Sequence, residues 1–341
     1  MERLTLEEIG RMAGVSRSTV SRVVNEQPGV SEEAKQRVLE IIDETGFRPN
    51  SAARSLVSNR TGVLGLVIPS SVHSVFADPY FGRLIQGITS EANALEQTLS
   101  LFLFEDEREE LEMYPRVVSN GLLDGLIVTA TKMDDPLVAR MAAGGTRFVM
   151  VGRPDRPGVP YVDVTNRGGA REATRHLIGH GHTEIALISA PSNTTTGVDR
   201  RLGFFDAMAE AGLDTPTHRI CEGDYTEQGG FDAMAQLLES PPRAVFCASD
   251  SMAAGAIRAI TGAGLECPAD IAVVGFDDLS ERFSSALGLT TIAQPVRATG
   301  REAVKLLLDV IDAGGESAER RLLPTELRVR SSCGCDEGGV D

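Results

Sequence analysis

The chain has 341 residues, 42% of them hydrophobic, and a formal net charge of −16, so it is long enough for two or three domains with a large core. Tryptophan is absent, and no apolar run reaches the ~18 residues that a membrane span needs. The first residues are too acidic for a signal peptide, so we expect a soluble, cytoplasmic protein without a membrane partner. The acidic excess lies beyond residue 60, because residues 1–60 hold nine Lys or Arg and nine Asp or Glu.

The N-terminal segment carries the signals of three capped helices. Thr5, Ser16 and Ser31 each precede a stretch with helical spacing of apolar residues, and a hydroxyl at that position accepts a hydrogen bond from the first turn. Gly14 lies in the short break between the first two helices, where a left-handed backbone costs little. Two helices joined by so tight a turn predict a helix-turn-helix that lays one helix in the DNA major groove. The expected helices cover residues 6–13, 17–25 and 32–45.

The second helix has a face of guanidinium, hydroxyl and amide groups that suits base edges and phosphates. The alternative is a solvated face that contacts nothing, but the complete three-helix frame favours DNA. The acidic part of the chain beyond residue 60 repels nonspecific DNA. The N-terminal segment is near neutral, so its binding to DNA has to rely on specific contacts. The residues of this face are Arg17, Ser18, Thr19, Ser21, Arg22 and Asn25.

Residues 50–58 form at most a short helix, below the ~12–15 residues that are stable alone in water, so we expect order only when a partner packs against it. Leu56 is an apolar residue among small and polar ones, which is typical of a wedge inserted into the minor groove. The alternative is a plain linker.

Three motifs, 6–25, Gly46-Phe-Arg-Pro-Asn50 and Ala52-Ala-Arg54-Ser-Leu56, resemble the lactose-repressor (LacI/GalR) family, and the resemblance runs through the whole chain. It implies that Arg17, Ser18 and Arg22 read base edges in the major groove. It also implies that the DNA backbone is held by Thr5, Ser16, Thr19, Ser21 and Asn25. It also implies a hinge helix that folds against its dimer mate in the minor groove. The predicted DNA-contacting residues are Thr5, Leu6, Ser16, Arg17, Ser18, Thr19, Ser21, Arg22, Asn25, Asn50, Ala53, Arg54 and Leu56.

From Thr61 onward, short apolar runs alternate regularly with helical stretches, which predicts buried parallel strands in doubly wound α/β sheets. Two such series indicate two lobes, with the chain crossing between them near 161–163 and 290–294. A last helix (297–312) and a strand (322–329) complete the pattern. Expected strands are 63–68, 99–104, 126–129, 148–151, 185–189, 219–222, 244–247 and 271–275; expected helices are 80–97, 108–120, 135–143, 167–180, 200–211, 226–239 and 250–263.

The predicted fold class is therefore α/β, with an all-α helix-turn-helix headpiece and a hinge helix; the family resemblance implies a two-lobe, periplasmic-binding-protein-like (type I) body. The last six residues have no heptads, which predicts a dimer rather than a tetramer. The expected divisions are headpiece 1–48, hinge 49–60, lobe 1 at 61–161 and 293–323, lobe 2 at 162–292 and 324–335, and tail 336–341.

Polar and aromatic residues follow almost every predicted strand, where open α/β sheets bind ligands. Carboxylates and a guanidinium bind vicinal hydroxyls, and an aromatic ring stacks on a sugar face. Asp250 and Arg200 have the alternative role of helix caps. The resemblance assigns Arg200, Asp277 and Gln294 to the effector site, while Ser249-Asp250 departs from the usual Asn-Asp. The predicted effector-binding residues are Ser70, Phe76, Tyr80, Phe81, Arg153, Asn193, Arg200, Tyr225, Ser249, Asp250, Asp277 and Gln294.

Five cysteines, an odd number, predict free thiols in a cytoplasmic chain. Cys333-Gly-Cys335 is a single C-x-C without a partner pair, and His180-Gly-His182 closes a helix, so neither motif alone predicts a metal site. We expect no cofactor and no metal.

The leading hypothesis is a nucleoid-associated homodimeric repressor that binds a pseudo-palindromic DNA operator and is controlled by a sugar or sugar derivative. A nucleobase-type co-repressor is the alternative effector. A transport-associated sugar-binding protein predicts an export signal and no helix-turn-helix, and neither fits. An enzyme is not expected, because no G-x-G-x-x-G follows the first strand and no P-loop or G-x-S-x-G motif is present.

Overall fold

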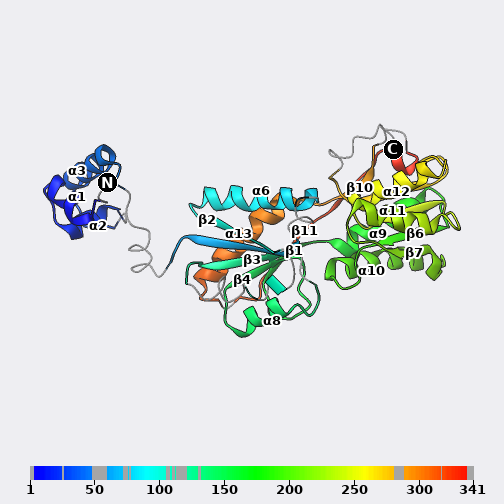
Figure 1. Cartoon of the computed structure of the whole chain (residues 1–341), viewed down its shortest axis with the longest axis horizontal. Coiled ribbons are helices and arrows are strands. Elements are labelled where there is room, and N and C mark those ends of the chain that lie inside the picture. The colour runs from blue at the N-terminus through cyan, green and yellow to red at the C-terminus, as the bar shows by residue number, and fades with distance from the viewer. Residues whose placement is uncertain are drawn as a thin grey trace. The chain divides into compact units, whose positions relative to one another are not determined.

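The computed structural model describes residues 4–24, 27–47, 60–71, 76, 78–104, 108–109, 112, 121–129, 132–279, 288–315 and 317–335. The expected hinge helix with Asn50, Ala53, Arg54 and Leu56, as well as Asn25, most of the expected helix 108–120 and the tail, lies outside these residues. The chain divides into two compact units, Met1–Gly62 and Val63–Asp341 (Figure 1). In the described part of the chain, no helix is long and apolar enough to cross a membrane.

The first unit is a three-helix bundle with the predicted caps. Its helices are α1 (Leu6–Ala13), α2 (Arg17–Val24) and α3 (Glu32–Thr45). Thr5 and Glu8 form a reciprocal capping box, and Ser31 Oγ accepts from the backbone of Ala34 at 3.3 Å. The buried residues from the three helices pack into one core: Ile9, Ala13, Val20, Val23, Val38 and Phe47.

The turn between α1 and α2 is tight because two glycines permit it. A Cβ on Gly10 would lie 2.8 Å from the carbonyl oxygen of Val15, closer than real side chains approach. Gly14 ends α1 in the left-handed region, at φ 66°. The sequence therefore fixes a close approach of the two helices, as a helix-turn-helix requires.

The second unit contains two six-stranded sheets, each with helices on both faces (Figure 1). The first sheet has the order β11-β5-β4-β3-β1-β2, and all of its pairings are parallel. We call this sheet with its helices lobe 1. Its strands are β1 (Val63–Ser71), β2 (Thr98–Phe104), β3 (Gly125–Thr129), β4 (Phe148–Val151), β5 (Tyr161–Val164) and β11 (Arg320–Leu323). Helices α6 (Pro79–Ala94) and α13 (Val296–Asp312) pack on one face, and α8 (Pro136–Ala143) packs on the other.

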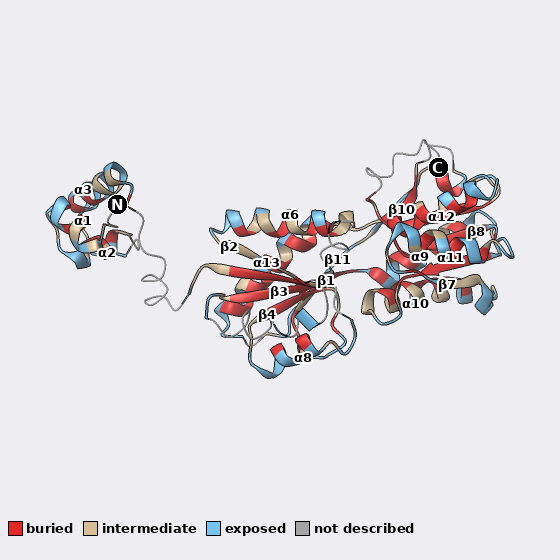
Figure 2. Cartoon of the chain, in the orientation of Figure 1, coloured by how far each residue is buried: buried red, intermediate tan, exposed pale blue. Residues whose placement is uncertain are grey.

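Lobe 2 repeats this arrangement with the strand order β12-β10-β9-β8-β6-β7, in which only the β10–β12 pair is antiparallel. Its strands are β6 (Ile185–Ser189), β7 (Ile220–Glu222), β8 (Ala244–Cys247), β9 (Ala272–Asp277), β10 (Thr290–Ala293) and β12 (Glu326–Arg328). Helices α9 (Asn166–Gly179) and α10 (Thr195–Glu210) cover one face, and α11 (Glu227–Leu237) and α12 (Asp250–Gly262) cover the other. Short 3₁₀ turns lie at Thr217–Arg219 (η1) and Ser331–Cys333 (η3). The central strands of both lobes are buried on both faces (Figure 2).

Three details differ from the sequence-based expectation. The expected strand 322–329 is two strands in different sheets, because Pro324 lacks an N–H and interrupts the ladder between β11 and β12. Strand β5 pairs with β4 in lobe 1, so the first crossing follows Val164 instead of residue 161. Helix α10 begins at Thr195, before the expected residue 200, because Thr194 Oγ1 accepts from Gly197 N at 3.1 Å.

The chain thus crosses between lobes three times, after β5, after β10 and between β11 and β12. Multiple crossings between two lobes are typical of a hinge.

The contact between α9 and α10 depends on one small residue. A Cβ on Gly203 would clash with the backbone oxygen of Arg167 and approach Ala170 Cβ to 2.8 Å. We expect Gly203→Ala to lower the free energy of unfolding of the body by about 1–3 kcal/mol through overpacking, measured by urea unfolding with far-UV circular dichroism. Gly179→Ala, also on α9 but with no atom within 4 Å of the added Cβ, is the control and should be neutral or raise stability by up to about 1 kcal/mol. Equal effects of both changes would contradict the packing role of Gly203.

Candidate functional site

The first candidate site is the outer face of α2. Arg17, Ser18 and Arg22 are exposed, and Thr19 and Ser21 are half-buried. No acidic residue lies in the first turn of α2, so its positive end is not neutralised. The exposed guanidinium groups are therefore accessible for base edges or phosphates.

Other residues predicted to contact DNA also stabilise the bundle. Ser16 Oγ accepts from the backbone of Thr19 at 3.2 Å, which caps α2. Thr5 caps α1, and its hydrogen bonds lower the pKa of Glu8. Leu6 packs against the bundle core. These contacts position α2; contacts with DNA stay a prediction.

The second candidate site is centred on a buried guanidinium at the carboxyl ends of the lobe 2 strands. Arg200 on α10 is 3% exposed, and its Nη1 donates to Asp277 Oδ1 at 3.2 Å and to the carbonyl oxygen of Ala248 at 2.5 Å. The guanidinium carbon lies 3.6 Å from the ring centroid of Phe276. A buried charge is tolerated only when it is paired and hydrogen-bonded, so these contacts hold α10 against the end of β9.

The hydrogen bonds of this arginine reach both of the first two chain crossings. Arg200 Nε donates to Asn166 Oδ1 at 2.9 Å, and Asn166 Nδ2 donates to Asp163 Oδ1 at 2.9 Å. On the other side, Gln294 Nε2 donates to Asp277 Oδ1 at 2.5 Å. Asp163 and Asn166 flank the first crossing, and Gln294 begins the second. We call these five residues the Arg200 network.

The structure therefore brings together three predicted residues, Arg200, Asp277 and Gln294, and adds two that the sequence-based list did not contain. The available signal for Asp163 was an acid inside the four-residue strand 161–164. Asn166 opens the next helix and is 3% exposed; the family resemblance marks the Thr165-Asn166 position, where the family more often has Asp-Asn. A buried acid in a strand has to be paired, and this requirement is what ties Asp163 to the network.

The two consecutive acids at the end of β9, Asp277 and Asp278, pair with different arginines. Asp277 and Asp278 have φ values of 122° and 58°, a region that costs non-glycine residues about 1–3 kcal/mol each and is typical of functional sites. Asp277 belongs to the Arg200 network. Asp278 Oδ1 accepts from Arg330 Nη2 at 2.6 Å, and its carbonyl oxygen accepts from Arg83 Nη1, on α6 of lobe 1, at 2.9 Å. The strained turn thus joins the network, the other lobe and the C-terminal segment.

Asp250 is hydrogen-bonded to the chain directly after this turn, and Ser249 caps the helix that Asp250 begins. Asp250 is fully buried, with Oδ2 accepting from Leu279 N at 2.7 Å and Oδ1 accepting from Thr291 Oγ1 at 2.6 Å. Burial, together with the nearby Asp277, raises the pKa of Asp250 to about 8. Ser249 Oγ caps α12 at Met252 N. Both side chains are used within the protein, so contact with a ligand stays a prediction for them.

Two tyrosines lie near the network. Burial raises the pKa of Tyr80, and the Asp163 and Asp277 carboxylates raise it further. Burial also raises the pKa of Tyr225, while Arg200 counteracts this shift. The charges of the network therefore act on one tyrosine from each lobe, Tyr80 of lobe 1 and Tyr225 of lobe 2.

The remaining predicted residues are arranged differently. Phe81 packs in the core of lobe 1 and is 8% exposed, so its ring supports Tyr80, at 5.4 Å between centroids. Phe76 is 68% exposed and Asn193 is also exposed, so neither belongs to the buried group. The side chain of Ser70 lies outside the described residues.

Arg153 bridges the lobes. It follows β4 of lobe 1, and its guanidinium donates to both carboxylate oxygens of Asp199, on α10, at 3.0 and 2.8 Å. The bidentate pair with Asp199 raises the pKa of Arg153. The Arg153–Asp199 pair therefore ties the end of β4 in lobe 1 to α10 in lobe 2.

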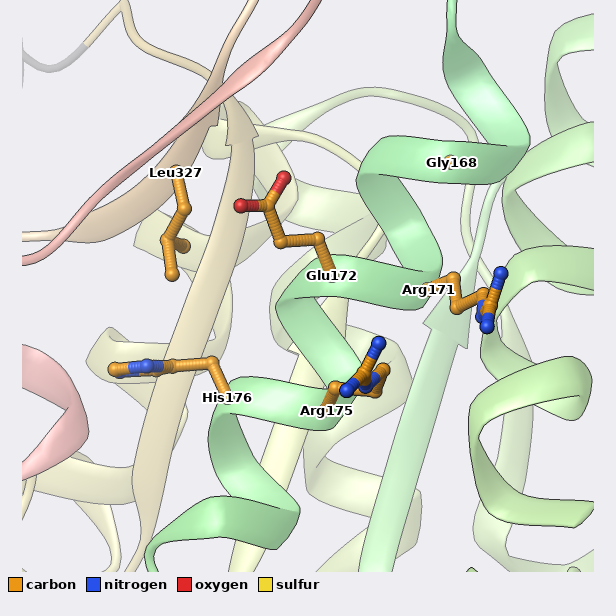
Figure 3. A pocket seen from close by; sticks show the side chains of 6 residues that line it. All are labelled: Gly168, Arg171, Glu172, Arg175, His176 and Leu327. Atoms are coloured by element: carbon orange, nitrogen blue, oxygen red, sulfur yellow. The ribbon is translucent and has the colours of Figure 1, made fainter. Parts of the chain in front are cut away.

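A separate hollow lies on the outer face of α9 (Figure 3). None of the predicted effector-binding residues lines it. Its lining residues are Gly168, Arg171, Glu172, Arg175, His176 and Leu327.

A three-helix DNA-binding unit together with a two-lobe body that carries a polar network at its strand ends defines the class of ligand-responsive DNA-binding regulators. Comparison with known families agrees: residues 5–50 match the family described as bacterial regulatory proteins, lacI family, and residues 174–333 match a periplasmic binding protein-like domain.

A curated relative, the HTH-type transcriptional regulator CelR of Thermobifida fusca, is 36% identical over 97% of this chain and 98% of its own length. The structure of a transcriptional regulator CelR–cellobiose complex aligns with a TM-score of 0.77 and 33% identity, covering 97% of this chain and 100% of that chain. The lac repressor dimer bound to operator and the anti-inducer ONPF aligns with a TM-score of 0.84 and 28% identity, covering 97% and 99%. The chain belongs to the LacI family of transcriptional regulators, so the predicted family and fold class are confirmed.

The buried acid at the first crossing predicts a pH dependence. Burial raises the pKa of Asp163 from 3.8 to about 6, so the native protein binds more protons than the unfolded chain between these values. The contribution of Asp163 to stability is complete below about pH 4 and is lost as the pH rises through 6. Relative to Asp163→Asn, the wild type should lose about 2 kcal/mol of unfolding free energy between pH 4 and 7. Urea unfolding at several pH values measures this difference.

Asp206→Asn is the control for this experiment. Asp206 is half-buried, and its hydrogen bond from Arg167 lowers its pKa, so its contribution has the opposite sign and is lost as the pH falls. A wild-type difference from Asp163→Asn that does not vary with pH would contradict the raised pKa.

Proposed function

We propose that the chain is a homodimeric repressor whose affinity for a pseudo-palindromic operator is controlled by a small, sugar-like effector bound between the lobes. The observation that carries this proposal is the Arg200 network at the carboxyl ends of the lobe 2 strands. Effector control by a sugar is also supported by the cellobiose complex of the CelR regulator, and dimeric operator binding by the lac repressor dimer on its operator.

The chemistry of the cleft suits a polyhydroxylated ligand. Asp277 and Arg200 supply a carboxylate and a guanidinium in a buried setting, where hydrogen bonds to charged groups are strong. Tyr80 and Tyr225 supply aromatic surface from opposite lobes. Hydroxyl groups of a sugar fit the first pair, and its apolar C–H face fits the second.

Binding in this cleft has a direct route to the chain crossings. Asp163, Asn166 and Gln294 lie where the chain passes between lobes, and all three are hydrogen-bonded into the Arg200 network. A ligand that binds Asp277 or Arg200 therefore changes the relative stability of open and closed lobes. We propose that this change determines whether paired hinge segments, residues 49–60, order on DNA with Leu56 in the minor groove.

The role of the α2 face is tested by Arg22→Ala. Loss of an exposed guanidinium that binds a base edge should weaken operator binding by about 1–3 kcal/mol and relax specificity at one position of each half-site. Fluorescence anisotropy with an operator selected from a random DNA pool measures both effects. Arg37→Ala removes a charge from α3 that is paired with Glu33, and it should change binding far less. Equal losses for the two variants would contradict base reading by Arg22.

The role of the cleft is tested by Asp277→Asn after a ligand screen. A thermal-shift screen of mono- and disaccharides, starting with cellobiose, and of phosphosugars and nucleobases identifies the effector. Asp277→Asn should weaken that ligand at least about 100-fold, because it leaves Arg200 without its ionic partner, while operator binding without ligand persists. Calorimetry and anisotropy measure the two affinities.

Asp232→Asn, an exposed carboxylate on α11, is the matched control and should keep the full response. An effector response that survives Asp277→Asn would reject the cleft assignment. A hit only among nucleobases would replace the sugar by the co-repressor class.

A further inference from the structure

Four metal-binding side chains from two distant parts of the sequence meet on lobe 2. His176 and His180 come from the end of α9, and Cys333 and Cys335 come from the C-terminal segment. One ligand atom from each residue lies within 4.8 Å of all the others. Cys335 Sγ lies 3.0 Å from His180 Nε2 and 3.8 Å from His176 Nε2. We call these residues the Cys–His cluster; it is separate from the Arg200 network.

The two histidines are on the same side of α9. Residues four apart on a helix are neighbours, and the two imidazole rings have centroids 4.7 Å apart. Helix α9 ends at Gly179, and His180 caps it while keeping a helix-like backbone (φ −82°, ψ 7°). In Figure 3 the ring of His176 extends from α9 on the side where Leu327 of β12 lies. The pair therefore faces the strand that leads to the two cysteines.

The two cysteines are held in place by a well-bonded turn. Ser332 is fully buried; its Oγ accepts from Thr290 N at 2.8 Å and donates to the carbonyl oxygen of Val273 at 2.7 Å. Gly334, at φ 90°, turns the chain between the cysteines, a conformation that side chains rarely adopt. Cys333 is 2% exposed and packs with Cys335 against α9 in the lobe 2 core. The segment thus presents both sulfur atoms before any ligand binds.

We propose that the Cys–His cluster is a binding site for a zinc-class divalent cation that fastens the C-terminal segment to α9. Two thiolates and two imidazoles are a donor set typical of structural zinc. Four ligands leave no open coordination position, so the site is structural, not catalytic. Neither the C-x-C motif nor the histidine motif predicts a metal site alone. The fold brings His176 and His180 next to Cys333 and Cys335, and this set of four ligands does predict one.

The distances fit this assignment. Ligand atoms about 2.0–2.3 Å from a zinc ion in tetrahedral geometry lie about 3.3–3.8 Å from one another. The separations of Cys335 Sγ from the two imidazoles bracket this range, and the full set lies within 4.8 Å. Small side-chain rotations therefore complete the coordination.

The cation would also stabilise a segment that contacts the strained turn of the effector cleft. Arg330, just before the cysteines, donates to Asp278 Oδ1 at 2.6 Å and to the carbonyl oxygen of Leu289 at 2.7 Å. Fixing residues 333–335 on α9 limits the freedom of Arg330. Metal loss is thus expected to lower the stability of lobe 2 first.

Cobalt(II) uptake by the tag-free full-length chain tests the proposal, after reduction and removal of metal by chelator. The expected result is one cobalt per chain, with thiolate-to-cobalt charge-transfer absorption and the strong visible bands of tetrahedral coordination, both lost on adding zinc. Zinc at about 100 times its Kd should raise the melting temperature by about 5–10 °C. His180→Gln, at an exposed position, and Cys335→Ser each remove one of the four ligands and should each weaken cobalt binding more than about 100-fold.

His182→Gln and Cys221→Ser are the matched controls. His182 lies between α9 and β6, Cys221 lies in β7, and neither belongs to the Cys–His cluster. They should leave cobalt affinity and spectrum unchanged. Cobalt binding without thiolate absorption, equal affinity of the His180 and Cys335 variants with the wild type, or a Cys333–Cys335 disulfide whose reduction restores no metal binding would each overturn the proposal. The DNA-binding and sugar-response assays are independent of these outcomes.

Discussion

The arrangement of the body depends on one constraint: the Arg200 guanidinium is buried and must be neutralised. A buried, unpaired charge costs several kcal/mol, so the partners of Arg200 have to remain in place. They come from separate elements, with Asp277 at the end of β9, Asn166 at the start of α9 and the Ala248 carbonyl after β8. The same condition that holds lobe 2 together therefore gathers charged and polar groups at the strand ends, where ligands bind in open α/β sheets.

In the proposed function, this constraint links ligand binding to lobe movement, because both involve the same network. Asp163 and Gln294 stand at two of the three chain crossings and are tied to the buried arginine through Asn166 and Asp277. A group that satisfies Arg200 or Asp277 in place of a protein partner changes the free energy of the crossings as well. In the proposed function, the ligand and the protein groups compete for the same hydrogen bonds, and the outcome shifts the balance between open and closed lobes.

The C-terminal segment is also held to the end of β9 by a charged pair, Arg330 with Asp278. Asp277 and Asp278 adopt a strained backbone, and each carboxylate is directed to a different arginine, Arg200 or Arg330. Strain of this kind persists only where surrounding contacts over-determine it. The Ser332 hydrogen bonds and the proposed cation at the Cys–His cluster supply such contacts on the Arg330 side.

The sequence alone determined the three-helix unit, the two series of strands and helices, and the roles of Arg200, Asp277 and Gln294 as candidates, because caps, apolar periodicity and strand-end polarity are local signals. The tertiary structure alone decided which distant residues meet. Asp163 and Asn166 are hydrogen-bonded into the network of Arg200, and Phe81 packs in the core of lobe 1. Pro324 divides one expected strand between two sheets. His176 and His180 lie next to Cys333 and Cys335. The physical reason is that these contacts are fixed by sheet order and chain crossings, and local sequence spacing carries no record of either.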